Sequence, residues 1–161
     1  MERFPHKVEK ILNRQGVEKP VLIGEYYHNL DTKGRVSIPS KFRDDLGGTF
    51  VLSKGLDNCL YAYSVEEWEG FQRDLLELRG KEAQKVRRFF FSGASECEID
   101  SQGRVVIPPV FREYAGLTKE LVIIGNSNRA EIWDKKNWES YISDSSFDSE
   151  EIAEAMERLG L

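Results

Sequence analysis

Two arginines stand where their side chains could bind an anion. Arg35 and Arg104 each follow a glycine directly, and each lies four residues after an aspartate, Asp31 or Asp100. A guanidinium that projects from a compact turn can bind a phosphate or the edge of a guanine through two parallel hydrogen bonds. The same spacing allows each aspartate to pair with its own arginine and merely hold the turn, a contact of about 0 to 1 kcal/mol at a surface. The spacing leaves both interpretations open, and they are compatible, because an aspartate can orient the arginine that binds.

The rest of the chain offers little for catalysis or for a metal ion. The only histidines are His6 and His28, and no serine, cysteine or aspartate stands in a triad-like arrangement. We interpret His28 as a strand histidine rather than a general base. Cys59 and Cys97 have no second cysteine or histidine at metal-ligand spacing, so we expect both to be buried apolar residues. The prediction is a protein that is not an enzyme and uses no cofactor, metal or small-molecule substrate.

Each aspartate–arginine motif belongs to one copy of an internal repeat. Asp31-Thr-Lys-Gly-Arg-Val-Ser-Ile-Pro39 returns 69 residues later as Asp100-Ser-Gln-Gly-Arg-Val-Val-Ile-Pro108, and the identity continues to Arg43 and Arg112. Stacked-repeat arrays need about three or more units, so two copies indicate a duplicated small domain. Arg43 and Arg112 could pair with a neighbouring subunit or touch a phosphate, and the spacing does not decide between these roles.

Composition and charge narrow the possible partners. The chain of 161 residues is 40% hydrophobic and 32% charged, with a formal net charge of −5. It lacks an apolar run long enough to span a membrane, and its first twenty residues do not resemble a secretory signal, so we expect a cytoplasmic protein. Four basic residues nevertheless cluster at the first motif: Lys33, Arg35, Lys41 and Arg43. An acidic chain with a basic edge could hold a polyanion if several copies acted together, which predicts an oligomer.

The residues around each motif predict short strands and helices. Residues 24–30 and 35–38 are rich in β-branched and aromatic residues and predict a β-hairpin, which 96–99 and 104–107 repeat. In the first copy, a helix over 41–46 capped by Ser40 is expected next, followed by strands over 49–52 and 59–63. A capping box of Ser64 and Glu67 then begins a second helix, and a third helix is expected over 81–91. The second copy is expected to continue with a helix over 110–114, strands over 120–124 and 130–133, and a helix capped by Asp134.

A last helix is expected near the C-terminus. Asp148 and Glu151 have the spacing of a capping box, and four apolar residues follow at the i, i+3, i+4 and i+7 positions of one helix face: Ile152, Ala155, Met156 and Leu159. This apolar stripe needs a surface to pack against.

The doubled motif resembles the MraZ family, with further matching segments at 115–120 and 131–134 in the family order. The resemblance implies two SpoVT-AbrB-type domains, in a mainly β α+β fold whose hairpins interleave into a pseudo-two-fold β-barrel with peripheral helices. It also implies a ring, most readily an octamer, that binds double-stranded DNA at direct repeats upstream of its own division and cell-wall gene cluster and represses transcription there. Such a protein would be found in the cytoplasm, associated with the nucleoid. The alternative is an antitoxin-like module that uses the same barrel to bind a protein.

Carried onto this chain, the family's DNA-facing motif places its residues on the two turns. Arg35 and Arg104 would contact DNA, Lys33 would assist at phosphates, and the turns would be shaped by Asp31, Gly34, Asp100 and Gly103. The expected organisation is an N-terminal extension over 1–20, a first domain over 25–67, a helical linker over 68–95, a second domain over 96–139 and a C-terminal helix over 140–161. Because family members begin near the equivalent of Val21, we expect translation to start there through a GUG codon, which would make 1–20 an over-long gene prediction.

Overall fold

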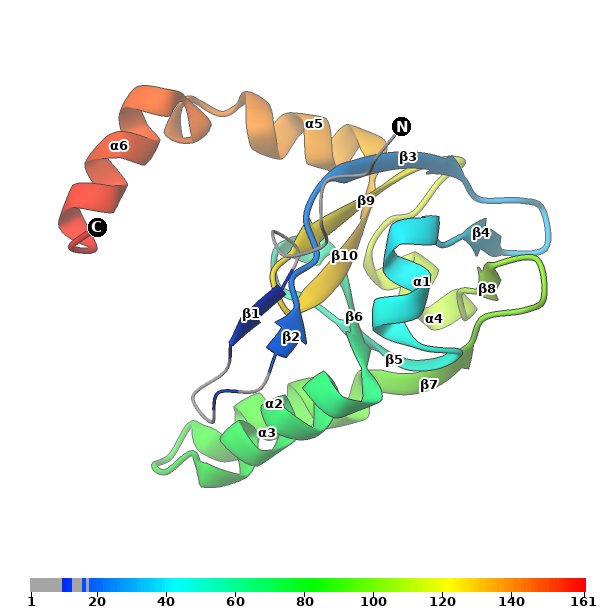
Figure 1. Ribbon diagram of the computed structural model, residues 1–161, viewed down its shortest axis with the longest axis horizontal. Helices are drawn as coiled ribbons and strands as arrows, with labels where there is room; N and C mark the ends of the chain where they lie inside the picture. Colours follow the sequence, from blue (N-terminus) through cyan, green and yellow to red (C-terminus); the bar gives the residue numbers. More distant parts are fainter. Residues whose placement is uncertain (1–9, 13–15, 17) are drawn as a thin grey trace.

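The central feature of the fold is an antiparallel sheet whose strands come from both sequence repeats. The structure is a computed structural model that describes residues 10–12, 16 and 18–161 (Figure 1). Among these residues, six strands pair in the order β3-β9-β10-β6-β5-β7. Their bounds are Glu25–Asn29 (β3), Thr49–Lys54 (β5), Leu60–Ser64 (β6), Ala94–Glu98 (β7), Glu120–Asn126 (β9) and Arg129–Asp134 (β10). The fold is therefore mixed α+β, as predicted.

The two repeats exchange their first strands. β3 of the first repeat pairs with β9 of the second, and β7 of the second repeat pairs with β5 of the first. The strands β4 (Arg35–Ser37) and β8 (Arg104–Val106) pair with each other in a separate two-stranded ribbon, which places Val36 opposite Val105. The predicted hairpins over 24–38 and 96–107 are therefore wrong, since the two strands beside each turn pair with different partners.

The expected interleaving is present, but the described strands do not close into a hydrogen-bonded barrel. β4 and β8 leave the main sheet at the two turns and bond to one another, so β3 and β7 remain the edges of an open sheet. A third pair of strands, β1 (Lys10–Leu12) and β2 (Glu18–Pro20), lies apart from both.

The described residues also form six α-helices and two short 3₁₀ helices. The short helices α1 and α4 follow the two turns, α2 and α3 form a helical hairpin between β6 and β7, and α5 and α6 end the chain (Figure 1). Their bounds are Ser40–Leu46 (α1), Val65–Glu77 (α2), Ala83–Ser92 (α3), Pro109–Tyr114 (α4), Lys135–Ser143 (α5), Ser149–Arg158 (α6), Leu56–Asn58 (η2) and Ser145–Phe147 (η3). None of the described helices is long and apolar enough to cross a membrane.

The predicted helix caps are only partly correct. The backbone N–H of Glu67 donates to the Ser64 hydroxyl at 3.1 Å, which confirms that cap. The Ser40 cap is wrong, because Pro39 occupies the N-cap position of α1 and makes no side-chain bond. Asp134 precedes α5 as predicted, but its carboxylate accepts hydrogen bonds from Thr118 instead of from the helix. Asp148 likewise stands at the N-cap of α6 without a side-chain cap bond.

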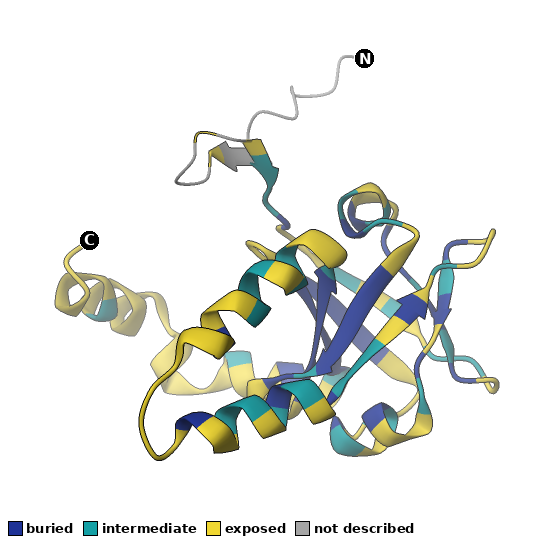
Figure 2. Cartoon of the chain, turned by 90° about the horizontal axis from the view of Figure 1, so that it is seen from below, coloured by how far each residue is buried: buried dark blue, intermediate teal, exposed yellow. Residues whose placement is uncertain are grey.

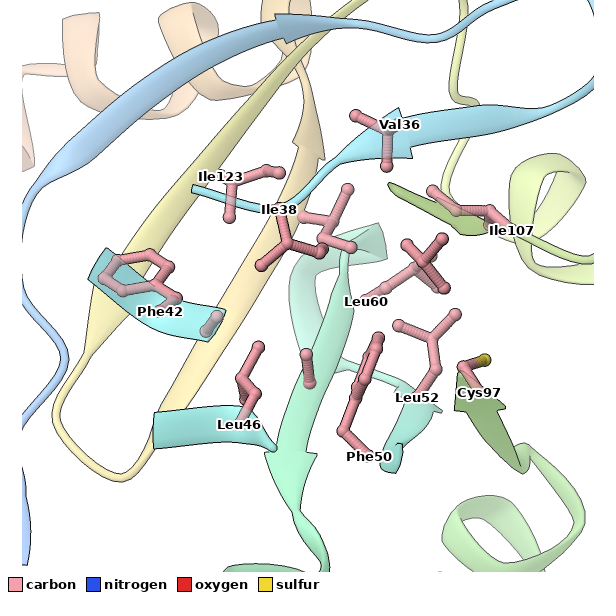
Figure 3. Packing of buried hydrophobic residues seen from close by; sticks show 14 of the residues in the cluster. Val36, Ile38, Phe42, Leu46, Phe50, Leu52, Leu60, Cys97, Ile107 and Ile123 are labelled. Atoms are coloured by element: carbon pink, nitrogen blue, oxygen red, sulfur yellow. The ribbon is translucent and has the colours of Figure 1, made fainter. Parts of the chain in front are cut away.

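Two apolar cores lie on opposite faces of the sheet. Because side chains alternate along a strand, Leu60 and Ala62 of β6 join one core while Tyr61 and Tyr63 join the other. The first core contains Val36, Ile38, Phe42, Leu52 and Ile107, so it ties the β4–β8 ribbon and α1 to the sheet (Figure 3). The second core is mainly aromatic and packs α2, α3 and α5 against the other face.

The two cysteines are buried, as predicted, and only part of the predicted N-terminal extension lies within the described residues. Cys59 and Cys97 are free thiols in the two cores, and burial raises the pKa of Cys97 to about 11 and raises that of Cys59 further. Of the N-terminal extension expected over 1–20, the structure describes residues 10–12, 16 and 18–20, and Leu12 is exposed.

Candidate nucleic-acid interface

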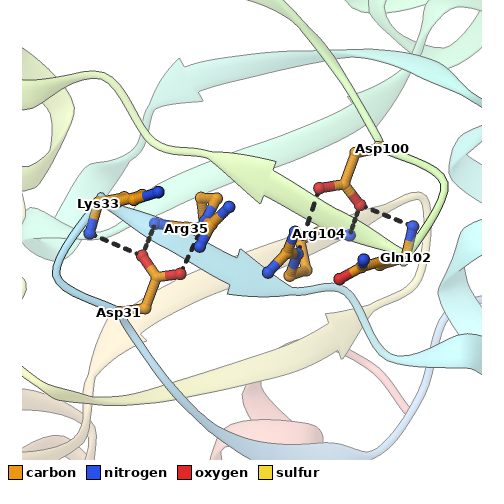
Figure 4. A network of polar contacts seen from close by, with 6 residues as sticks. All are labelled: Asp31, Lys33, Arg35, Asp100, Gln102 and Arg104. Atoms are coloured by element: carbon orange, nitrogen blue, oxygen red, sulfur yellow. Dashed lines mark hydrogen bonds and ion pairs between the residues drawn. The ribbon is translucent and has the colours of Figure 1, made fainter.

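The first turn is organised around one carboxylate. Oδ1 of Asp31 accepts hydrogen bonds from the backbone N–H groups of Lys33 and Arg35, both at 2.9 Å, and Oδ2 accepts from Nε of Arg35 at 2.7 Å (Figure 4). The N–H of Gly34 donates to the Asp31 carbonyl at 3.0 Å. The aspartate therefore holds both the backbone of the turn and the base of the arginine side chain.

The second turn repeats this geometry. Oδ1 of Asp100 accepts from the backbone N–H groups of Gln102 and Arg104, both at 2.9 Å, and Oδ2 accepts from Nε of Arg104 at 3.2 Å. The interpretation that each aspartate pairs with its own arginine is thus confirmed at both turns. It leaves anion binding possible, because a guanidinium carries four further N–H donors on its two terminal nitrogens.

Hydrogen bonding keeps both aspartates charged. The pKa of Asp31 and that of Asp100 lie below their ordinary value, chiefly because each carboxylate accepts the backbone N–H of the arginine four residues later. The stability that these bonds provide is present at neutral pH and is lost as the pH falls through the folded-state pKa. The turns are therefore fully formed in the neutral range, where a polyanion would be bound.

The β4–β8 ribbon places both arginines on one face. Val36 and Val105 are 1% and 2% exposed and point into the core, so their neighbours along the strands point outward. Ser37 lies opposite Arg104 in the register, and Arg35 is two residues before Ser37 on the same strand. Arg35 and Arg104 are thus diagonal neighbours on the outer face, a relation that separates two residues by about 7–8 Å.

Two arginines that the sequence left ambiguous support the turns. Nε of Arg43 donates to the carbonyl of Ile38 at 2.9 Å, and its guanidinium covers Gly103, where an added Cβ would lie 2.2 Å from Cζ. Arg112 makes the matching bond to Ile107 at 3.0 Å and covers Gly34, with a corresponding separation of 3.0 Å.

Each helix arginine therefore supports the turn of the other repeat. Because Gly34 and Gly103 also have φ angles of +77° and +79°, glycine is required there for conformation as well as space. The exact repetition of Arg43 and Arg112 was the signal in the sequence, but the cross-repeat contact requires the strand exchange to be known.

The remaining predicted residues divide between the two turns and the strands beside them. Lys33 is exposed at the tip of the first turn, and the uncharged Gln102 occupies the equivalent place in the second. His28 lies on β3, where partial burial and then the charge of Arg43 lower its pKa, so it is neutral at pH 7. Among the described residues, no cluster of histidine, cysteine or acidic side chains could hold a metal ion.

The geometry defines a class of protein with a duplicated, strand-exchanged fold that presents two supported arginine turns on one outward surface. A family model described as "MraZ protein, putative antitoxin-like" matches residues 21–89 and again residues 90–159. The chain therefore belongs to the MraZ family.

Curated relatives agree with this assignment. The transcriptional regulator MraZ of Acetivibrio thermocellus is 55% identical over 140 residues, which cover 86% of this chain and 98% of that protein. The proteins of the same name from Caldicellulosiruptor saccharolyticus and Alkaliphilus oremlandii are 53% and 54% identical over 143 residues, which cover 88% of this chain and all of each relative. These relatives are named as regulators rather than enzymes, in agreement with the prediction that this chain is not an enzyme.

Proposed function

We propose that this protein is a transcriptional regulator that binds specific double-stranded DNA through its two arginine turns. The observation that carries the proposal is the pairing of β4 with β8, which sets Arg35 and Arg104 side by side on the outward face of one ribbon. Asp31 and Asp100 hold the arginines at Nε, and the terminal nitrogens are the donors that would bind a phosphate or a guanine edge. Lys33 would add a phosphate contact at the first turn.

An acidic chain needs several such surfaces to hold DNA. With a net charge of −5, one copy has little long-range attraction for a polyanion. In a homo-oligomeric ring, for which we propose eight subunits, the ribbons would engage successive sites on one duplex and gain affinity by linkage. By the resemblance to MraZ, the sites would be direct repeats upstream of the protein's own division and cell-wall gene cluster, and binding would repress transcription in the nucleoid.

The second candidate is an antitoxin-like function, in which the same fold binds a protein. One observation favours it: no residue of α6 is buried, so the chain has a surface that a protein could cover. The charge of the two turns favours DNA at the β4–β8 ribbon, and the two functions would use different surfaces.

Fluorescence anisotropy of a labelled duplex from the gene's own upstream region tests the proposal. We expect the Arg35→Ala/Arg104→Ala protein to lose about 5- to 150-fold in affinity per arginine, the equivalent of about 1–3 kcal/mol for each base-reading pair, while a scrambled duplex binds weakly to both proteins. Lys136→Ala is the control, since Lys136 is an exposed basic residue on α5, away from the two turns. Affinity should also fall steeply with salt, and less steeply in the double variant.

Equal weak binding to both duplexes by the wild-type protein and the double variant would contradict the proposal. In that case the arginines would serve only to support the turns, and a protein partner would become the leading candidate.

A further inference from the structure

The C-terminal helix α6 is formed but unpartnered. It contains ten residues, none of them buried, and only Ala155 is even half-buried (Figure 2). Its end is well defined, since the N–H groups of Gly160 and Leu161 donate to the carbonyls of Glu157 and Met156 in a Schellman motif. Isolated helices shorter than about 12–15 residues are marginal in water, so α6 needs a surface that covers its apolar stripe.

The base of α6 is held in place by aromatic packing. Phe147 of η3 packs against Trp138 and Tyr141 of α5, with ring centroids 6.4 and 5.6 Å away. The carboxylate of Asp144 accepts the N–H of Ser146 at 2.8 Å and thereby caps η3. In Figure 1, α6 extends from this point away from the sheet. α6 is therefore presented as an arm, with Ile152, Met156 and Leu159 exposed along it.

We propose that α6 docks on the α2–α3 hairpin of a second copy of this chain. The proposal rests on the homo-oligomer proposed above and names the surfaces that would build it. Donor and acceptor are different parts of the same chain, so the contact is heterologous, and repetition of such a contact gives a closed ring or an open filament.

Charge complementarity favours this occupant. Residues 144–161 carry six acidic side chains and one arginine, whereas residues 73–88 carry six basic and three acidic side chains. Lys85 and Arg88 are exposed on α3, and Lys81 is exposed in the turn that precedes this helix. Two α6 helices packed together would instead bring acidic surfaces into contact, and like charges across an interface weaken it.

The hairpin also offers apolar surface beside these charges. Leu76 and Leu78 are 55% and 39% exposed at the end of α2. Arg87 of α3 donates to the carbonyls of Leu75 and Leu78 at 3.3 and 3.2 Å, which ties the end of α2 to α3 and keeps this surface in one conformation. The exposed leucines can cover the stripe of α6 while the surrounding lysines and arginines meet its glutamates.

Crosslinking between two variants of the full chain, each with one added cysteine, tests the contact. Met156→Cys places a thiol on α6 and Leu78→Cys places one on the hairpin, while the native thiols are buried and have raised pKa values. With a short bis-maleimide, we expect a crosslinked pair when the two variants are mixed and little crosslinking within either variant alone. Strong self-crosslinking of Met156→Cys would overturn the proposal, because it would show that α6 pairs with itself.

Charge reversal supplies an independent test, with the oligomer mass measured by light scattering. Glu151→Lys/Glu157→Lys and Lys81→Glu/Lys85→Glu should each raise the concentration for half-assembly by at least about tenfold, and their combination in one chain should restore assembly. Glu113→Lys, on the exposed side of α4, is the control and should assemble normally. Assembly that neither reversal changes would overturn the docking surface alone, whereas a monomeric wild-type chain would overturn the homo-oligomer as well.

Discussion

At the scale of single residues, the two turns depend on contacts that cross between the repeats. Arg43 is fixed by the carbonyl of its own Ile38 and covers Gly103, and Arg112 does the same at Ile107 and Gly34. The N–H of Ile38 also donates to the Gly103 carbonyl at 2.9 Å, and that of Ile107 to the Gly34 carbonyl at 2.8 Å. Neither turn can therefore move without disturbing the other repeat.

The turn glycines provide the prediction at this scale. An alanine at position 34 or 103 would have to adopt a left-handed backbone conformation, and its Cβ would press on a guanidinium. Each alanine variant should therefore lose at least about 1–2 kcal/mol of unfolding free energy, measured in urea. The loss should be greater at Gly103, where the approach to Arg43 is closer. Gly48→Ala is the control, because Gly48 has no positive φ and open space around it. Equal stability of all three variants would contradict this account.

At the scale of elements, the sequence predicted the type of secondary structure of each segment better than it predicted which strands pair. The strand pair β5–β6, the helical linker and the short helices after each turn were all predictable, because alternation and turn residues are local signals. The partners of β3 and β4 were not, since Asp31 and Gly34 specify a tight turn without specifying that the strands beside it pair with each other. The same limit hid the support of the turns by Arg43 and Arg112.

The predicted caps of α2 and α1 differ in outcome: Ser64 caps α2, whereas Ser40 does not cap α1. Ser64→Ala should cost about 1 kcal/mol of unfolding free energy, because its hydroxyl satisfies the N–H of Glu67 at the start of α2. Ser40→Ala is the matched control and should have little effect, since Ser40 lies inside α1 and makes no cap bond. Chemical denaturation of both variants checks this, and a larger loss for Ser40→Ala would show that the two helix starts have been interpreted wrongly.

At the scale of the whole molecule, the exchange of β3 and β7 makes the two halves interdependent. The register of β3 on β9 repeats in that of β7 on β5, with Glu25 opposite Ile124 and Ala94 opposite Ser53. One half therefore contains the strand that the other half needs.

A fragment containing one repeat tests this dependence. Residues 21–89 alone lack β9, the partner of β3, but a second fragment could offer β5 in its place. We expect the fragment to be a dimer when folded, with little folded monomer at micromolar concentrations, as measured by light scattering and circular dichroism. The full-length chain is the reference for secondary-structure content. A stable folded monomer of the fragment would contradict the view that strand exchange holds the halves together.

Strand exchange inside one polypeptide also gives the β4–β8 ribbon, the surface proposed to bind DNA, a polarity. In a dimer of identical chains both turns would be the same, and a symmetric protein matches a palindromic site. Here the two turns belong to different parts of one chain and can differ in sequence. The first turn has Lys33 where the second has Gln102. The ribbon consequently has a cationic end and a neutral end, so that a duplex lying along it would be read in one direction only.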